Sequence, residues 1–422
     1  MLWAIFVVAF ARYVFIASSG LGAPPESGDA HDYDAIGYNL WKGRGYGYSW
    51  SDPEYRAPYE GRARYRSLLN RQSGYYPTAY RPPALPVLLS ALYAITDRNF
   101  AAWRIVNAGF MAGAVALAAA VAARFGGVPA ALLCALALFQ HAQLTRYSYV
   151  FMTEGLAACL VTLLAFLWVR NSQEDWTARR AAVCGLVLGA LMASRSIFVL
   201  WIALALFVPA VRSATGRRSR VFGPAVCAVC ALLVIGPWWV RNIAVTGAFM
   251  PTGTQAPLNL PMGFGPRALE HEGMWRSNPG DGVEELAAEG VDPFSIEYEV
   301  RLAKIRSAMA FAWMRENPRD VLRLMALHVW QEIRPRGRVP WDWLLPAGVS
   351  ALVFFGRRPG AAALALMLSA QILSVALTWG AGGRFMVPVH PFLVALVCAA
   401  AVAIVARAAR EGAALRRGPQ PA

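Results

Sequence analysis

A short acidic stretch follows the first apolar segment of the chain. Apolar residues fill most of positions 2–18, and Asp29, Asp32 and Asp34 lie shortly after them. A carboxylate at the mouth of a membrane can act as a general base that takes a proton from an attacking hydroxyl. Apolar residues then recur at helical spacing up to Leu40, which predicts a short helix lying on the surface with Asp29 near its start. The alternatives are a solvated loop or an Asp29 that only caps the helix, and we expect Asp32 and Asp34 to be solvated.

Five further charged residues stand at the edges of later apolar segments. They are Arg81, Glu154, Arg195, Arg241 and Arg384. Charged side chains cost about 2.5–3.5 kcal/mol in the middle of a bilayer, so they tend to face cavities or partners. Because arginine donates paired hydrogen bonds to phosphate oxygens, the pattern indicates a ligand with an anionic head and an apolar tail, such as a lipid-linked sugar phosphate. The alternatives are that Arg81 anchors the chain to lipid headgroups and that Glu154 caps a helix.

The composition is typical of a polytopic membrane protein. Of the 422 residues, 57% are hydrophobic and 15% are charged, and apolar runs of membrane-spanning length separate the charges. The formal net charge of +15 does not indicate a nucleic-acid partner, because the basic residues lie in short turns between apolar runs. That distribution is the positive-inside pattern, which orients a chain in the membrane. The six cysteines lie in apolar segments without metal-site spacing, so we expect neither a metal nor a cofactor.

The apolar runs predict an all-α protein of about ten membrane spans. They cover residues 2–18, 102–123, 129–144, 155–169, 181–193, 197–211, 222–240, 341–355, 361–379 and 386–406. If the N-terminus is cytoplasmic, every arginine cluster between these spans falls on the cytoplasmic side. The same arrangement brings Asp29 and the charged residues at the span edges together at the outer face.

The segments outside the spans form parts of a single transmembrane domain. They are a first outer loop, 19–82, a second outer loop, 242–340, and a basic cytoplasmic tail, 407–422. The apolar run 87–95 is too short to span and predicts a juxtamembrane or re-entrant helix on the outer side. In the second loop, helices are expected at 295–315 and 319–332. The stretch 50–76 is rich in Tyr and Arg without a clear period, and we make no prediction for it.

Several motifs, in chain order, resemble the GT-C glycosyltransferases. The first is Asp29 with Tyr33, Gly37 and the later turn Gly43-x-Gly45-Tyr46. The others are Tyr80-Arg81-Pro82-Pro83-Ala84-Leu85-Pro86, residues 148–154 ending in Met-Thr-Glu, Pro237-Trp238-Trp239-Val240-Arg241-Asn242, and Gly383-Arg384-Phe385-Met386-Val387-Pro388. The branch that they resemble is the bacterial one related to protein O-mannosyltransferases and to the lipid A aminoarabinose transferase.

The resemblance implies transfer of a sugar from a polyprenyl-phosphate carrier to an acceptor hydroxyl or amine, with inversion at the anomeric carbon. On this reading Asp29 is the catalytic base, Arg81 and Arg384 approach the donor phosphate, and Glu154 helps to shape the site. The remaining expected substrate contacts are Tyr33, Arg195 and Arg241. The partners would be the lipid-linked donor, membrane lipids and a glycan, lipid or protein acceptor.

Two departures from the family pattern limit what can be carried over. The acidic pair of the mannosyltransferases is Asp29-Ala30 here, and Phe385 replaces the usual tyrosine of the last motif. A transporter or flippase of lipid-linked sugars, or a lipid-binding envelope protein without catalysis, remains an alternative. The Arg- and Ala-rich composition with little lysine suggests a bacterial source, which places the protein in the inner membrane with its site facing the periplasm or the exterior.

Overall fold

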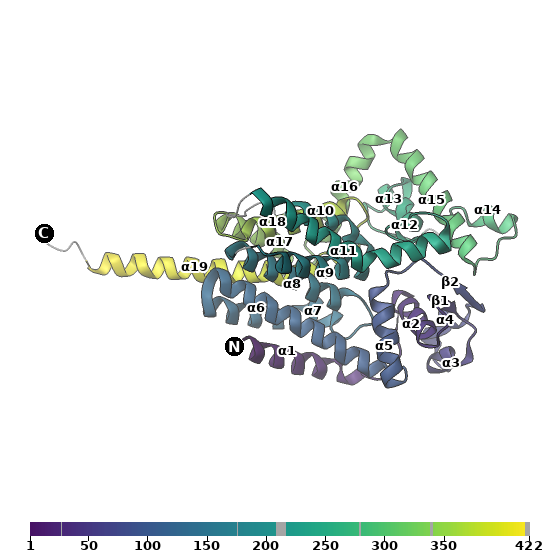
Figure 1. Cartoon of the computed structure of the whole chain (residues 1–422), viewed down its shortest axis with the longest axis horizontal. Coiled ribbons are helices and arrows are strands. Elements are labelled where there is room, and N and C mark those ends of the chain that lie inside the picture. The colour runs from purple at the N-terminus through teal and green to yellow at the C-terminus, as the bar shows by residue number, and fades with distance from the viewer. Residues whose placement is uncertain (27, 175, 208–216, 278–279, 338–340, 418–422) are drawn as a thin grey trace.

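The computed structural model describes residues 1–26, 28–174, 176–207, 217–277, 280–337 and 341–417. It is a bundle of helices with further short elements gathered at one end, which we call the loop end, while the N-terminus and the last described turn of the final helix lie at the opposite end (Figure 1). The first half of the chain forms α1 (Leu2–Ala17), α2 (Gly28–Trp41), β1 (Gly47–Ser49), α3 (Pro53–Arg56), α4 (Arg66–Leu69), β2 (Tyr75–Pro77), α5 (Ala84–Thr96), α6 (Phe100–Phe139), α7 (Ala142–Tyr147), α8 (Glu154–Gln173) and α9 (Ala178–Ser194). The second half forms α10 (Ile202–Phe207), α11 (Arg217–Thr246), α12 (Gln255–Gly263), α13 (Pro266–Glu270), α14 (Val283–Ala288), α15 (Ile296–Glu316), α16 (Pro318–Ile333), α17 (Leu344–Phe354), α18 (Ala361–Ala376) and α19 (His390–Arg417).

The predicted all-α, polytopic architecture is confirmed. Five helices of the described chain are long and apolar enough to cross a membrane, namely Leu2–Gly20, Phe100–Phe139, Glu154–Gln173, Phe222–Thr246 and Val387–Ala413. Shorter apolar helices are Ala84–Thr96, Trp341–Phe354 and Ala361–Ala376. Helices therefore occur along most of the expected spans, although length and composition single out five of them.

Two of the expected spans belong to one bent helix. The runs 102–123 and 129–144 fall largely within α6, which changes direction at Gly127 (φ 73°). Only glycine adopts that backbone conformation without strain, and Pro129 follows it directly. The expected span 197–211 begins with a 3₁₀ turn, Ser196–Trp201, before α10, and its later residues lie outside the described part of the chain.

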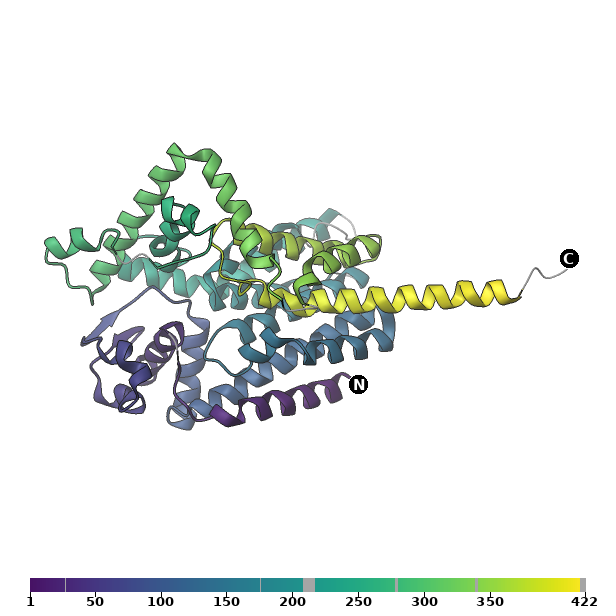
Figure 2. The same cartoon turned by 180° about the vertical axis from the view of Figure 1, so that it is seen from behind.

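Small residues allow the central helices to approach closely. The helix α19 packs along α6 (Figure 2), and α6 also contacts α1 and α8. The helix α11 packs along α9. Alanines such as Ala112 and Ala119 of α6 and Ala395 and Ala399 of α19 are fully buried. In a bilayer the lipid tails are as apolar as the helices, so helix association depends largely on van der Waals packing. Small residues favour this packing because they let the helix backbones approach closely.

The helix α2 forms as predicted, but the expectation that it lies on the surface is wrong. Every residue from 30 to 39 is buried, and α2 packs against α5. The approach is so close that a Cβ at Gly37 would lie 2.8 Å from the Cβ of Leu89. The reason is the stretch 50–76, which folds over α2 with a set of buried aromatic side chains, including Tyr55, Tyr59 and Tyr65.

Asp34 is completely buried, so the expectation of a solvated side chain is wrong. Its carboxylate accepts hydrogen bonds from Tyr59 Oη at 2.5 Å and Tyr93 Oη at 2.6 Å. The guanidinium of Arg98 donates to it as well, with Nη2 at 2.6 Å from Oδ2. A buried carboxylate is stable only with such partners. Asp34 therefore connects α2, through these hydrogen bonds and this ion pair, to the aromatic cluster and to the start of α6.

We expect Arg98→Met to destabilise the protein by about 3–5 kcal/mol, since it leaves Asp34 charged, buried and without its counter-ion. Thermal unfolding in detergent measures the effect. Arg64→Met is the matched control, because Arg64 pairs with Glu26 on the surface, where an ion pair contributes about 0–1 kcal/mol. Equal melting temperatures for the two variants would contradict the structural role of the buried pair.

The second outer loop contains both of the helices predicted for it. The predictions 295–315 and 319–332 correspond to α15 and α16, which form a hairpin beside the bundle (Figure 1). Glu299 of α15 reaches the first loop, where it accepts hydrogen bonds from Thr78 Oγ1 at 2.6 Å and the Ala79 amide at 2.9 Å. Burial raises the pKa of Glu299 although these hydrogen bonds favour its ionised form. The two outer loops are thus joined at the loop end.

Candidate functional site

Asp29 lies in the first turn of α2 and is half-buried. Its two carboxylate oxygens bind different arginines: Oδ1 lies 2.6 Å from Arg81 Nη2, and Oδ2 lies 2.9 Å from Arg384 Nη1. These arginines come from sequence positions more than 300 residues apart. Asp29 therefore joins the first outer loop to the loop before α19.

Asp32, one helical turn after Asp29, holds Arg81 from a second side. Arg81 Nε and Nη2 lie 3.0 and 2.7 Å from Asp32 Oδ2, and Arg71 Nη1 lies 3.3 Å from Oδ1. The side chain of Asp32 is buried, so the expectation that it is solvated is wrong. The spacing of three residues between Asp29 and Asp32 puts both on one helix face, and this signal was available in the sequence.

A second ion-pair group lies beside the first. Glu154, the first residue of α8, is fully buried, and its Oε1 lies 2.8 Å from Arg195 Nη1. The same oxygen accepts a hydrogen bond from Arg384 Nε. Arg195 is positioned by the end of α9, which it follows directly. Arg384 is thus shared between the carboxylates of Asp29 and Glu154, and its orientation is determined by both.

The electrostatics of the cluster keep Asp29 ionised. Burial opposes ionisation of Asp29, but the guanidiniums of Arg81 and Arg384 outweigh it and hold the pKa of this carboxyl below its ordinary range. The pKa of each of these arginines is raised above the usual value, although burial works against the charge. Asp29 in this state is a charged hydrogen-bond acceptor but a weak base.

A cavity of about 470 Å³ opens beside these charges. Asp29, Arg81, Arg195 and Arg384 form its charged end. The neutral polar part of the cavity is formed by Tyr80, Ser196, Gln255, Asn259 and Trp275. Its apolar wall is formed by Ile197, Leu200, Leu377, Trp379 and Phe385. Its volume lies within the range of about 300–1,000 Å³ that small-ligand sites occupy. The cavity combines an anion-binding end, neutral hydrogen-bonding groups and an apolar surface.

Six of the seven predicted site residues meet at this cavity. Asp29, Tyr33, Arg81, Arg195 and Arg384 line it, and Glu154 lies behind Arg384. Arg241 is elsewhere: its Nη1 donates to the carbonyl of Thr78 at 2.6 Å and its Nη2 to the carbonyl of Tyr46 at 2.9 Å. These bonds connect α11 with the first loop, and we leave Arg241 out of the proposed site.

Three uncharged residues of the cavity were missed in the sequence. Trp275 Nε1 donates to Asn259 Oδ1 at 2.9 Å, and Asn259 Nδ2 lies 3.4 Å from Tyr80 Oη. Trp275 and Asn259 come from the second outer loop, which offered no local signal for a site. Such a chain of amide, indole and phenol groups can exchange hydrogen bonds with hydroxyl-rich ligands.

Glu332 was also missed, and it determines the path of the loop that carries Arg384. This buried carboxylate, near the end of α16, accepts hydrogen bonds from the amide of Phe385 at 2.8 Å and from the amide of Ala381. Burial raises the pKa of Glu332, although the amide hydrogen bonds oppose that shift. Since the amides on both sides of Arg384 bind one carboxylate, Glu332 is a positioning residue for its guanidinium.

We expect Glu332→Gln to lower kcat by roughly 10- to 100-fold, because small misplacement of a catalytic group costs up to about 10²-fold in rate. The amide nitrogen of Gln cannot accept the hydrogen bond that one carboxylate oxygen accepts. Steady-state kinetics of the activity proposed below would measure this, beside melting temperature. Glu316→Gln, at the exposed end of α15, is the control. A loss of stability with unchanged kcat would mean that Glu332 is only structural.

The fold is GT-C-like. The chain is similar to the AglB oligosaccharyltransferase of Archaeoglobus fulgidus in its apo form, with 13% identity, a TM-score of 0.51 and coverage of 100% of this chain and 52% of that chain. The same protein in complex with an inhibitory peptide and a dolichol-phosphate gives 13% identity, a TM-score of 0.50 and the same coverage. ArnT from Cupriavidus metallidurans, bound to undecaprenyl phosphate, gives 14% identity and a TM-score of 0.43, over 93% of this chain and 76% of that chain.

The chain spans about half the length of the archaeal enzyme. The sequence matches no protein-family model and no curated protein. At these identities the likeness is one of fold, and the activity has to be argued from the site.

Proposed function

We propose that this protein transfers a sugar from a polyprenyl-phosphate carrier to an acceptor hydroxyl or amine at the outer face of a bacterial inner membrane. The observation that carries the proposal is the carboxylate of Asp29 held between Arg81 and Arg384 at the end of a cavity with an apolar wall. This arrangement supplies a base, two phosphate ligands and a surface for a hydrocarbon chain in one place.

The donor would place its phosphate among the arginines. Arg384 and Arg195 both line the cavity, and each can donate hydrogen bonds to phosphate oxygens while it keeps its contact with Glu154. The first isoprene units would lie against the apolar wall at Ile197 and Leu200. The sugar would then occupy the neutral part of the cavity, near Asn259.

The reaction is a single displacement at the anomeric carbon. The acceptor oxygen forms a bond to C1 while the bond from C1 to the phosphate oxygen breaks, and the configuration inverts. The acceptor's proton passes to Asp29, and the bonding electron pair leaves with polyprenyl phosphate. Arg81 and Arg384 stabilise the negative charge that develops on the departing phosphate.

Donor binding and base strength are coupled in this site. When a phosphate takes hydrogen bonds from Arg81 and Arg384, the carboxylate of Asp29 loses part of the stabilisation that holds its pKa down. Its pKa rises toward the ordinary aspartate value, and it becomes a stronger base only when the donor is in place.

The fold likeness supports the donor class. The archaeal oligosaccharyltransferase that shares the fold was solved with a dolichol-phosphate, which is a polyprenyl-type phosphate. A flippase would need polar groups distributed through the depth of the membrane, whereas the charges described above gather at the loop end.

The test uses the purified chain in lipid nanodiscs with a pool of radiolabelled polyprenyl-phosphate sugars. Release of label from the carrier with formation of polyprenyl phosphate is the expected result. Movement of labelled lipid between the leaflets of a proteoliposome, without any turnover, would reject the transferase and favour the transporter.

A further inference from the structure

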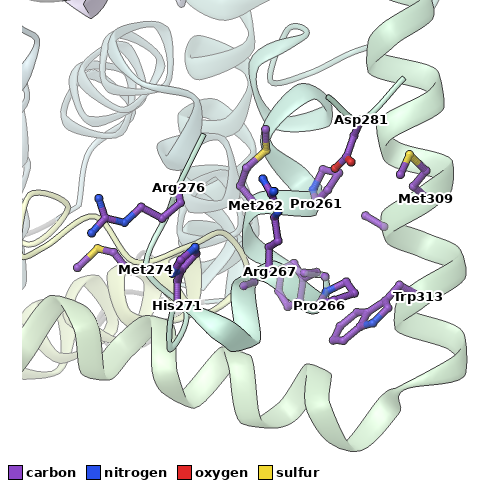
Figure 3. Close-up of a pocket in the computed structure, with 14 residues that line it drawn as sticks. Pro261, Met262, Pro266, Arg267, His271, Met274, Arg276, Asp281, Met309 and Trp313 are labelled. Atoms are coloured by element: carbon purple, nitrogen blue, oxygen red, sulfur yellow. The ribbon is translucent and has the colours of Figure 1, made fainter. Parts of the chain in front are cut away.

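A second cavity, of about 310 Å³, lies in the second outer loop (Figure 3). Its walls come from α12, α13 and α15 and from the segment between α13 and α14. None of its lining residues belongs to a helix that is long and apolar enough to cross a membrane. The cavity is thus part of the extramembrane portion of the loop end.

The two cavities are neighbours separated by one short segment. Met274 lines both of them. The backbone around Met274 is bonded to the loop that carries Arg384, because the Trp275 amide donates to the Gly380 carbonyl at 2.9 Å and the Gly380 amide donates to the Gly273 carbonyl at 2.9 Å. We call residues 273–276 the partition. A methionine side chain has three rotatable bonds and adapts easily, so the partition can open by a change of rotamer.

The second cavity has two chemically different sides. Arg276, Met274 and His271 lie on the partition side, and Met309 and Trp313 lie opposite on α15 (Figure 3). Arg276 is exposed, and no hydrogen bond or ion pair joins it to another residue of the described chain. Asp281 is the single acid among the lining residues, which include two arginines and a histidine. In Figure 3 the guanidinium of Arg276 points away from Trp313, so a change of the Arg276 rotamer would turn it toward an anion on the partition side, while the other side offers an apolar face to a ring.

We propose that this second cavity binds the acceptor as an acidic sugar unit, with its carboxylate or phosphate toward Arg276 and its ring against Trp313. The inference rests on the proposed function and deepens it. An indole offers a large apolar face to the C–H groups of a sugar ring, and a guanidinium binds the anion through paired hydrogen bonds. The acceptor hydroxyl would reach Asp29 past Met274.

The surroundings of the cavity favour a sugar over the other macromolecular classes. A lipid acceptor would need to keep its chains in the bilayer, but the lining contains no residue of the spanning helices. A peptide that binds by strand addition would need a free strand edge, and none of the lining residues belongs to a strand. The volume suits about one sugar unit, at the small end of ligand sites.

The experiment measures binding directly, by titration calorimetry of the full chain in nanodiscs. The probes are a uronic-acid disaccharide and the same disaccharide with its carboxyl groups reduced. We expect the acidic probe to bind at least tenfold more tightly than the neutral one, and Arg276→Gln to remove about tenfold or more of that affinity. Trp313→Phe should weaken both probes. Arg62→Gln, an exposed arginine of the first loop, is the matched control.

Three results would overturn the inference. The first is equal affinity of the protein for the two probes. The second is equal affinity of Arg276→Gln and Arg62→Gln for the acidic probe. The third is binding of an anionic vesicle or an acidic peptide through Arg276 and Trp313 in place of the sugar. The inference and the proposed function fail separately. Asp29→Asn should bind the acidic probe normally. In the unmodified protein, Arg276-dependent binding of the probe without any sugar transfer would reject only the transferase. Transfer with an unchanged acceptor KM in Arg276→Gln would reject only the acceptor site.

Discussion

Replacing Asp29 with Asn is expected to reduce sugar transfer by about 10²–10⁴-fold, the usual contribution of a positioned general base. Donor affinity should stay the same or increase, because an amide competes less than a carboxylate for Arg81 and Arg384. Single-turnover transfer and binding of polyprenyl phosphate, measured on the same preparation, separate the two effects.

Two controls make the Asp29 result specific. Glu60→Gln removes an exposed carboxylate of the first loop and should leave the rate unchanged. In the unmodified protein, kcat/KM should persist as the pH falls through the ordinary aspartate range, because the two arginines hold the pKa of Asp29 below that range in the donor-free state. It should be lost at lower pH, where the carboxylate is protonated. Transfer at a normal rate in Asp29→Asn would remove Asp29 from the role of base.

Arg384→Gln is expected to be the second severe change, with transfer reduced by about 10²–10³-fold, as for loss of one oxyanion-stabilising donor. Arg384 contacts both Asp29 and Glu154, so its removal should affect the proposed base, the proposed phosphate site and the fold together. Arg384→Lys keeps the charge without the planar fork, and we expect it to recover only a part of the rate.

The loss of stability in Arg384→Gln can be separated from the loss of transfer. Glu154 would remain buried with Arg195 as its one charged partner in the described chain. Arg384→Lys keeps a positive charge beside Glu154, so its melting temperature should stay near that of the unmodified protein while transfer remains reduced. If transfer in the two variants fell only in proportion to their loss of stability, Arg384 would act through stability and not through the donor phosphate.

The sequence predicted those parts of the site that depend on local chemistry and membrane topology. Four charged residues were expected at the outer face of the membrane, because each of them follows or precedes an apolar run on that side. They are Asp29, Arg81, Arg195 and Arg384. The structure brings these four to one cavity. The helix around Asp29 was predicted for a similar reason, since its apolar spacing is visible without tertiary information.

Contacts between distant segments could not be predicted in this way. Asp34 was expected in solvent, and only the fold shows that Arg98, 64 residues later, lies against it. Glu332 likewise has no local signal, because the amides that it binds belong to a loop about 50 residues away. The second cavity depends on a bend of irregular backbone around Met274, which periodicity cannot reveal.

The last helix has a consequence for the environment in which the protein works. The helix α19 has 28 residues, so it is about 42 Å long at 1.5 Å per residue, longer than the hydrocarbon layer of about 30 Å. Its C-terminal part projects from the bundle with Arg407 and Arg410 exposed (Figures 1 and 2). In the proposed topology these arginines rest among the headgroups of the inner leaflet, while the other end of the rod adjoins the Arg384 loop in the outer leaflet. The height of Arg384 relative to the phosphate of the proposed donor would then depend on bilayer thickness, and lipids with shorter or longer chains would change the proposed transfer rate through hydrophobic mismatch.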